Sequence, residues 1–534
     1  MKRKLATITI ALLSIVLISG SLSAQMPDEN TIKFGATLSL INRFYVDTVN
    51  QNSLTEKAIV EVLRSLDPHS SYISAKDVQE MNEPLTGNFE GVGIQFNVLR
   101  DSIMVVEPVP NGPSERVGIR AGDRIVIIND EKVTGIKISN SGVMSRLRGP
   151  KGTKVNISVF RKGEKDLLSF TITRDKIPIN SLDAAYRLND ETVYIKLNKF
   201  AATTEKEFTD AIAQFDDSKL KNIILDLRNN PGGYMIAAVE LANQFLEGQK
   251  LVVYMEGRKT PRQEYKSTGQ GSLTKVSLVI LTDEGSASAS EILAGAMQDW
   301  DRGVIIGRRT FGKGLVQNGY YLPDGSQIRL TIARYFTPTG RSIQSPYNEG
   351  YEKYMENFTK RFTDGELMNA DSIHFPDSLK FFTNINHRKV FGGGGIMPDV
   401  FVAADTSNFT DYYRDLIRRG IFYSFTLEYA DKNRQTLSSK YKKFDDFKDK
   451  FEFNESDIKQ FIKMGEDAGV KYNEKQFAVS KAEILKALKS FVAGDIWKTN
   501  EFYRIINEGD KVIDKALQIL ADKNTYNKIL GFRK

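Results

Sequence analysis

The feature that most constrains the fold is a regular alternation of apolar strands and helices in the middle of the chain. It starts near Ile177 with the run TVYIKLNKF and continues through NIILDLRNNPGG and VSLVILTDEG, with helical patterns between these runs. Apolar runs of strand length that alternate with helices are typical of an α/β layer. We therefore predict an α/β core over residues 176–344, which ends at 394–400 after a polar and aromatic insert at 345–393.

Other patterns stand on either side of this core. Apolar residues recur at helical spacing over residues 25–85, which predicts a small helical module, and Ser53 with Glu56 fits a capping box at the start of a helix. Short period-2 segments between glycine-containing turns predict the strands of a small domain over residues 86–175. Helical spacing returns over residues 401–534, so we expect a helical C-terminal domain.

The first 24 residues have the composition of a secretory signal peptide, with basic residues, an apolar run and small residues around Ala24. We expect cleavage near Ala24, or retention of the segment as a membrane anchor, and in either case export with a periplasmic location. The sequence contains no cysteine, which excludes thiol catalysis, disulfides and cysteine metal sites. A net charge of +7 over 534 residues is too dilute for a nucleic-acid-binding surface.

Ser288 lies in the segment GSASASE, at the expected start of a helix that follows an apolar strand. With Glu291 it fits a capping box, so its simplest role is to cap that helix. The same position gives a serine free N–H groups and the positive end of the helix dipole, which a developing oxyanion requires. Ala289 would supply one such N–H group. The NNPGG loop would supply the other, from Gly232 or Gly233, of which we favour Gly233.

Both loops follow strands of the core, at the carboxyl ends where sites form in open α/β sheets, so we expect them to meet. A serine hydroxyl needs a base that removes its proton, and no histidine lies near Ser288 in the sequence. Lys313, in TFGKGLVQ, can act as that base when burial lowers its pKa from about 10.4 toward neutrality. Gln317 could hold the amine without adding a charge that would raise its pKa. The alternative, a phosphate-binding loop in GRRTFGKG, fails because Gly314 has no hydroxyl group for a magnesium ion.

Taken together, these segments resemble the C-terminal processing proteases, also called tail-specific proteases. The resemblance covers residues from about 30 to 400 and rests on LDPHSSY, LRGPKGT, LDLRNNPGG, GSASASEILAGAMQD, TFGKGLVQ, LPDGSQIRLTIARYFTPTGRSIQ and GGIMPDV. It implies a crotonase-like or ClpP-like α/β catalytic core, with Ser288 as nucleophile, Lys313 as general base and Gln317 as the residue that orients the lysine. It also implies a serine endopeptidase that cleaves protein substrates near their C-termini through an acyl-enzyme, without a metal or organic cofactor.

Residues 86–175 resemble a PDZ domain. In that family a loop before a strand presents N–H groups to the terminal carboxylate of a peptide, and the peptide adds a strand to the sheet. Gly91 and Gly93 would permit this close approach. Val92 and Ile94 would line the pocket for the terminal side chain. A turn in an ordinary small β domain is the alternative.

Three further residues carry weaker expectations. Asp299 matches an acidic position of the protease motif, and its alternative role is an ion pair with Arg302 or Arg308. Arg148 matches an arginine that couples peptide binding to active-site assembly in some family members, and its alternative is a solvated arginine in a β-hairpin. We assign His69, in the LDPHSSY turn, to a structural role.

Two classes of function fit these features. One is an exported serine endopeptidase whose PDZ domain binds substrate tails, and the other is a non-enzymatic PDZ scaffold on a protease-like fold. The joint presence of Ser288, Lys313 and Gln317 favours the enzyme. A crotonase-like acyl-transfer enzyme would suit the core, but the PDZ segment argues against a small acyl substrate. The expected partners are proteins or peptides with accessible C-termini; an adaptor protein and a second copy of the chain are further candidates.

Overall fold

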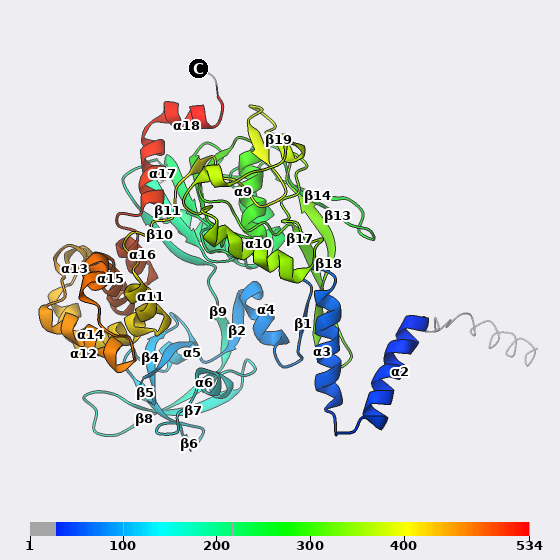
Figure 1. Ribbon diagram of the computed structural model, residues 1–534. Helices are drawn as coiled ribbons and strands as arrows, with labels where there is room; N and C mark the ends of the chain where they lie inside the picture. The colour runs from blue at the N-terminus through cyan, green and yellow to red at the C-terminus, as the bar shows by residue number, and fades with distance from the viewer. Residues whose placement is uncertain (1–27, 100, 216–217, 533–534) are drawn as a thin grey trace, which may run out of the picture. The chain divides into compact units, whose positions relative to one another are not determined.

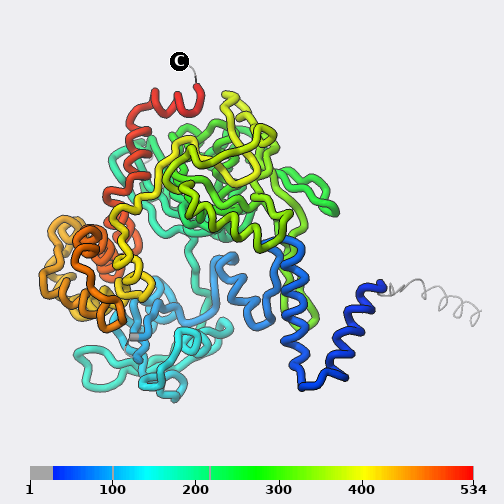
Figure 2. Tube along the Cα trace, in the orientation of Figure 1, coloured from blue at the N-terminus to red at the C-terminus, as the bar shows by residue number. Residues whose placement is uncertain are grey.

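The computed structural model describes residues 28–99, 101–215 and 218–532 (Figures 1 and 2). The expected signal peptide lies outside these residues. The chain divides into two compact units, of which the first ends at Leu66 and the second begins at Asp67. Among the helices that the structure describes, none is both long enough and apolar enough to cross a membrane.

The first unit contains two helices, α2 (Glu29–Phe44) and α3 (Gln51–Arg64). Asn50 caps α3, because its side chain accepts a hydrogen bond from the N–H group of Ser53 at 3.0 Å. The predicted capping box is therefore wrong: the helix starts earlier than expected, and Ser53 occupies its third position rather than its cap.

The second unit is built around a six-stranded sheet, in which five consecutive strands are parallel and β10 is antiparallel at one edge. The predicted alternation of strands and helices is confirmed in this sheet, because α7, α8 and α9 connect its strands. In spatial order its strands are β10 (Leu182–Arg187), β11 (Thr192–Leu197), β12 (Asn222–Asp226), β15 (Ser277–Thr282), β16 (Gly303–Gly307) and β21 (Val400–Phe401). The helices are α7 (Thr204–Ile212), α8 (Met235–Asn243) and α9 (Ala289–Asp299).

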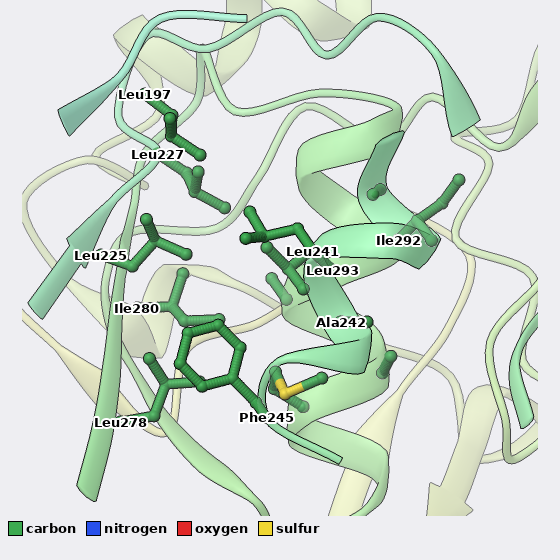
Figure 3. Close-up of a cluster of buried hydrophobic side chains, with 14 of the residues drawn as sticks. Leu197, Leu225, Leu227, Leu241, Ala242, Phe245, Leu278, Ile280, Ile292 and Leu293 are labelled. Atoms are coloured by element: carbon green, nitrogen blue, oxygen red, sulfur yellow. The ribbon is translucent and has the colours of Figure 1, made fainter. Parts of the chain in front are cut away.

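Both faces of this sheet are covered, which explains why its strands are apolar at consecutive positions. In β12, Ile223 and Leu225 belong to the cluster with α8 and α9, whereas Ile224 belongs to the cluster on the opposite face. Figure 3 shows the first cluster, where leucines of the strands pack against Phe245 and the helices. The opposite face is covered by α17 (Lys511–Ala521), so the end of the chain contributes to the core that carries the site.

A second sheet of five strands combines the end of the LDPHSSY segment with four strands of the core that precede the insert. Its central strand is β18, which pairs with β1, β13 and β17. The strands are β1 (Ser71–Ile73), β13 (Leu251–Glu256), β14 (Gln263–Lys266), β17 (Leu315–Tyr321) and β18 (Gln327–Phe336), and α4 (Val78–Thr86) follows β1.

The segment that resembles a PDZ domain forms its own sheet, with β3 at one edge, and β2 pairs separately with β9. An edge strand has unpaired backbone groups on one side, as strand addition by a peptide requires. The elements are β2 (Asn88–Gly91), β3 (Ile94–Leu99), β4 (Ser102–Pro108), α5 (Pro113–Arg116), β5 (Arg124–Ile128), β6 (Glu131–Lys132), α6 (Asn140–Leu147), β7 (Lys154–Phe160), β8 (Leu168–Thr173) and β9 (Asp175–Pro178).

The C-terminal region is mainly helical, whereas the insert combines one helix with short turns and a strand pair. The insert contains α10 (Tyr351–Thr363), the 3-10 turns Ala370–Ser372 and Asp377–Leu379, and the pair β19 (Lys380–Phe382) and β20 (Lys389–Phe391). The remaining helices are α11 (Asp411–Arg418), α12 (Ile421–Lys440), α13 (Phe444–Lys450), α14 (Glu455–Asp467), α15 (Glu474–Ile496), α16 (Thr499–Ile506) and α18 (Lys523–Ile529). Helices α11 to α15 bury an aromatic-rich cluster of their own.

Candidate active site

The predicted site residues come together in one cavity of about 770 Å³, whose lining includes Ser288, Lys313 and Gln317. The expectation that the two strand-end loops meet is confirmed. Ala287 donates its N–H group to the carbonyl oxygen of Asn230 at 3.0 Å, so the serine loop contacts the NNPGG loop directly.

Ser288 is half-buried and occupies the cap position of α9 with φ 55° and ψ −114°. Residues other than glycine rarely adopt a positive φ, and strained backbone conformations of this kind cluster at functional sites. The predicted capping box is confirmed, because the Glu291 carboxylate accepts the Ser288 N–H group at 2.8 Å. The helix start therefore holds the serine in an unusual backbone conformation that leaves it open to the cavity.

Two backbone N–H groups beside Ser288 have no hydrogen-bond partner among the residues the structure describes: those of Ala289 and Gly233. The N–H group of Gly232 is engaged, because it donates to the side-chain oxygen of Asn230 at 2.9 Å. A Cβ on Gly232 would lie 2.8 Å from the Ala289 nitrogen, and one on Gly233 would lie 2.0 Å from the carbonyl oxygen of Phe200. Only glycine fits these two positions, and the free N–H group favours Gly233 over Gly232 as an oxyanion donor.

Lys313 is half-buried in the same cavity. Burial lowers its pKa, and the positive charge of Arg329 lowers it further, whereas the carboxylates of Glu291 and Asp67 act in the opposite direction. Within the described part of the chain, its Nζ atom makes no hydrogen bond or ion pair. The pKa of Lys313 is thus shifted in the direction that a lysine base requires.

Gln317 lies on β17, directly after an irregularity in the pairing of β17 with β18. Its Nε2 atom is buried and, as far as the described residues go, has no hydrogen-bond partner. The structure therefore brings Gln317 into the cavity without a bond from its amide nitrogen, and its role in orienting Lys313 stays a prediction.

Glu291 does more than cap the helix, and no pattern in the sequence indicates this second role. Its fully buried carboxylate also accepts hydrogen bonds from the N–H groups of Gly312 at 2.7 Å and Lys313 at 2.9 Å, and from the Thr310 hydroxyl. Burial raises the pKa of Glu291 to about 7. One carboxylate therefore joins the backbone of the serine to the loop that carries the lysine.

Tyr335 makes a second connection between the two residues. Its buried hydroxyl group lies 3.1 Å from the carbonyl oxygen of Ser288 and also donates to the carbonyl oxygen of Lys313. The backbones of the two residues are thus held together by an acceptor, Glu291, and by a donor, Tyr335.

The fold brings one histidine toward the lysine. His69 lies 3.3 Å from the Tyr354 hydroxyl through Nε2, and its ring is 6.3 Å from that of Phe311. Burial, together with the positive charge of Lys313, lowers the pKa of His69 to about 4, so it is neutral at neutral pH. The turn expected around His69 is also present, because Asp67 accepts its N–H group at 2.8 Å.

Asp299 does not line the cavity. It is fully buried at the end of α9 and forms an ion pair with Arg341 at 2.7 Å. The two partners named from the sequence are wrong, because Arg302 donates to backbone carbonyl groups and Arg308 pairs with Glu284 at 2.8 Å.

Arg148 follows α6 as its cap residue, so the alternative that placed it in a β-hairpin is wrong. Its guanidinium group bonds Glu83 of α4 at 2.8 Å and lies 4.9 Å from the ring centre of Phe89. The neighbouring Asn82 accepts a hydrogen bond at 2.9 Å from Arg329, and both of these residues line the cavity. Arg148 is therefore connected to the cavity through α4.

The loop expected to hold a terminal carboxylate lies between β2, which ends at Gly91, and β3, which begins at Ile94. The N–H groups of Val92 and Gly93 have no partner in the part of the chain that the structure covers. Gly93 has φ 72°, and a Cβ there would lie 2.9 Å from Ile177. The Val92 side chain is buried in the core of its domain, whereas Ile94 is half-buried.

Three segments of the chain match models of known families. Residues 191–350 match the family model of Peptidase family S41, residues 91–172 match the PDZ domain, and residues 412–498 match a family of unknown function (DUF8443). A carboxy-terminal-processing protease of Bartonella bacilliformis is 36% identical over 343 residues, which are 62% of this chain and 77% of the relative. The carboxy-terminal processing protease CtpA of Bacillus subtilis (strain 168) is 32% identical over 357 residues, 64% of this chain and 76% of the relative. The solved structure of a photosystem II D1 C-terminal processing protease is 28% identical and covers 60% of this chain and 91% of its own, with a TM-score of 0.34.

The fold and the matches define a peptidase of family S41 with a PDZ domain. Within that class, the chain belongs to the carboxy-terminal processing proteases. The family predicted from the sequence is confirmed. The predicted fold class is confirmed with it: an α/β catalytic core, a PDZ domain and a helical C-terminal region.

Proposed function

We propose that this protease is an exported serine endopeptidase that cleaves protein substrates near their C-termini, with Ser288 as nucleophile and Lys313 as general base. The observation that carries the proposal is their joint position in one cavity, beside two N–H groups without partners. The strained backbone of the serine and the lowered pKa of the lysine add to it.

In the acylation step, neutral Lys313 accepts the hydroxyl proton of Ser288 as Oγ attacks the carbonyl carbon of the scissile peptide. The N–H groups of Ala289 and Gly233 stabilise the negative charge that develops on the carbonyl oxygen. The lysine ammonium then donates its proton to the leaving amine, and a water molecule releases the acyl group by the same sequence of steps. Gln317 orients the amine of Lys313 once substrate is bound.

The PDZ domain supplies substrate tails to this site. The free N–H groups of Val92 and Gly93 bind the terminal carboxylate, and the tail extends the sheet along β3. The contact of Arg148 with Glu83 carries the effect of a bound tail to α4, whose residue Asn82 holds Arg329 in the cavity.

The test compares the mature chain with Ser288→Ala, Lys313→Ala and Lys250→Ala variants. Lys250 is the matched control, because burial also lowers its pKa but it does not line the cavity. The substrate is an unstructured protein with an apolar C-terminus, and a fluorophosphonate probe reports on the serine. We expect cleavage and labelling of Ser288 in the wild type and in Lys250→Ala only. Equal rates in all four proteins, with no label on Ser288, would refute the mechanism.

Export is tested separately, because it does not depend on the chemistry. Deletion of residues 1–24 should leave the protease in the cytoplasmic fraction of its host, whereas the full chain should be recovered outside it. Equal distribution of the two forms would contradict the proposed export.

A further inference from the structure

The loop that carries Lys313 connects β16 to β17 and forms neither helix nor strand over residues 308–314. Backbone N–H and carbonyl groups of a buried loop need partners, and without secondary structure these must come from elsewhere. On one side, the Glu291 carboxylate accepts the N–H groups of Gly312 and Lys313, and Gln344 accepts that of Gly314 at 2.8 Å. The carbonyl groups of Arg309, Thr310 and Phe311, in the middle of the loop, are bound instead by the insert.

Arg361 of the insert binds these carbonyl groups. It lies on α10, is 7% exposed, and donates to the carbonyl oxygen of Arg309 at 2.8 Å and to that of Thr310 at 2.9 Å. A longer contact of 3.4 Å reaches the carbonyl oxygen of Phe311. One guanidinium group thus spans three consecutive residues just before Gly312 and Lys313.

Arg361 is itself held in place by a carboxylate of the insert. Glu366 accepts its Nε–H group at 2.8 Å and also accepts two hydrogen bonds from Arg309, at 2.9 and 2.6 Å. A buried guanidinium group with all these bonds is well satisfied, and its planar shape fixes the positions of its acceptors.

The insert also holds the side chain of Phe311. The ring centre of Phe311 lies 4.8 Å from that of Phe358 and 6.5 Å from that of Tyr354, and both of these residues belong to α10. The insert therefore contacts the backbone of Arg309, Thr310 and Phe311 and also the ring of Phe311, shortly before Lys313 in the chain.

We propose that Arg361 is a positioning residue for Lys313, and that the function of the insert of residues 345–393 is to place Arg361 against the loop. Arg361 holds the carbonyl side of the loop while Glu291 holds the N–H side, so that the amine of Lys313 lies in the cavity with Ser288. The inference deepens the proposed function, because it rests on Lys313 as the base.

Loss of Arg361 would leave the loop free to move and would expose Lys313 to water. Because burial is the main cause of the low pKa of Lys313, hydration would raise that pKa toward its ordinary value. Each unit of increase lowers the neutral fraction about tenfold at a pH well below the pKa. The rate should therefore fall at neutral pH and recover at alkaline pH, which a mere loss of stability would not produce.

The experiment measures kcat and KM between pH 6 and pH 10 for the full chain and for Arg361→Met, Arg361→Lys and Arg388→Met. Arg388 is the matched control, since it is also largely buried, binds Asp301 and Asp399 at 2.6 Å each, and lies outside the cavity. For Arg361→Met we expect kcat about tenfold lower at pH 7 and little change in KM. The acidic limb of the pH profile, in which kcat rises with pH, should move to higher pH by about one unit. Arg361→Lys keeps the charge but has one nitrogen, so it should restore part of the rate, and Arg388→Met should keep the wild-type limb.

Each alternative outcome has a defined meaning. If Lys313→Ala is inactive while Arg361→Met keeps the wild-type limb and kcat, the positioning role is overturned and the base is not. If Lys313→Ala retains activity, the proposed function itself fails. Should Arg361→Met not fold, Glu366→Gln and Arg361→Lys take its place, and wild-type limbs in both folded variants overturn the proposal.

Discussion

Replacement of Glu291 by glutamine should change how the stability of the catalytic core depends on pH. Burial raises the pKa of Glu291 to about 7 in the folded protein, compared with an ordinary value of 4.5. The folded state therefore binds this proton more tightly than the unfolded state. Between pH 4.5 and pH 7 the unfolded state holds fewer protons, so the free energy of unfolding falls as the pH rises, and it levels off above pH 7.

The size of the effect follows from the two pKa values. Their difference, 7 − 4.5, is about 2.5 units, which at 1.36 kcal/mol per unit amounts to about 3 kcal/mol. Glutamine does not titrate, so the variant should lack this slope. Its single oxygen also cannot accept all four hydrogen bonds, so Glu291→Gln should be less stable than the wild type at pH 5 and recover relative to it by pH 8.

The assay is urea denaturation at pH 5, 6, 7 and 8, followed by the fluorescence of Trp300 at the end of α9. The chain has two tryptophans, so a Trp497→Phe background makes the signal specific for the core. Glu240→Gln is the control, because Glu240 lines the same cavity but is exposed. If the free energy of unfolding changed with pH in the same way for Glu291→Gln and the wild type, the reasoning would be refuted.

Two further predictions concern positions around the site. Arg341→Met should lower the free energy of unfolding by about 3 to 5 kcal/mol in urea titrations, because it leaves the carboxylate of Asp299 buried without its ion pair. If this is the cause, the double variant with Asp299→Asn should lose less than the sum of the two single losses, and additive losses would contradict it. Gly233→Ala should abolish cleavage, because the new Cβ would lie 2.0 Å from the carbonyl oxygen of Phe200, whereas Gly248→Ala, with φ 70° and open space around it, should retain cleavage. A cleavage assay with circular dichroism of both variants checks this, and full activity of Gly233→Ala would show that the loop is not as rigid as described.

The parts of the site that were predictable depend on local signals or on a general rule of topology. Ser288 and Glu291 lie three residues apart, so their capping box is visible in the sequence. The meeting of their loop with the NNPGG loop followed from the position of both at strand ends of one parallel sheet. The choice of Gly233 over Gly232 rested on a preference, and the structure supports it by showing that the Gly232 N–H group is engaged.

The parts that were missed depend on contacts between residues far apart in the sequence. For Asp299 the sequence offers only neighbouring arginines as alternative partners, but the fold brings Arg341 to it from beyond β18 and gives Arg302 and Arg308 other acceptors. Arg148 likewise finds Glu83, 65 residues earlier in the chain. No periodicity in the sequence encodes such pairs, because each is fixed by how two separate elements pack.

The loop of Lys313 shows why an irregular segment is the hardest to predict and why charged residues define it. Glu291 can hold only the N–H side of the loop, and its negative charge raises the pKa of the lysine. The carbonyl side needs donors, and a guanidinium group supplies several donors, accepts none and stays charged when buried. Arginine can therefore bind the carbonyl groups without adding another negative charge beside the base. The charge of Arg361 is balanced by Glu366, which also belongs to the insert. In the sequence this insert only interrupts the core; in the fold it completes the hydrogen bonding of the segment on which the proposed base depends.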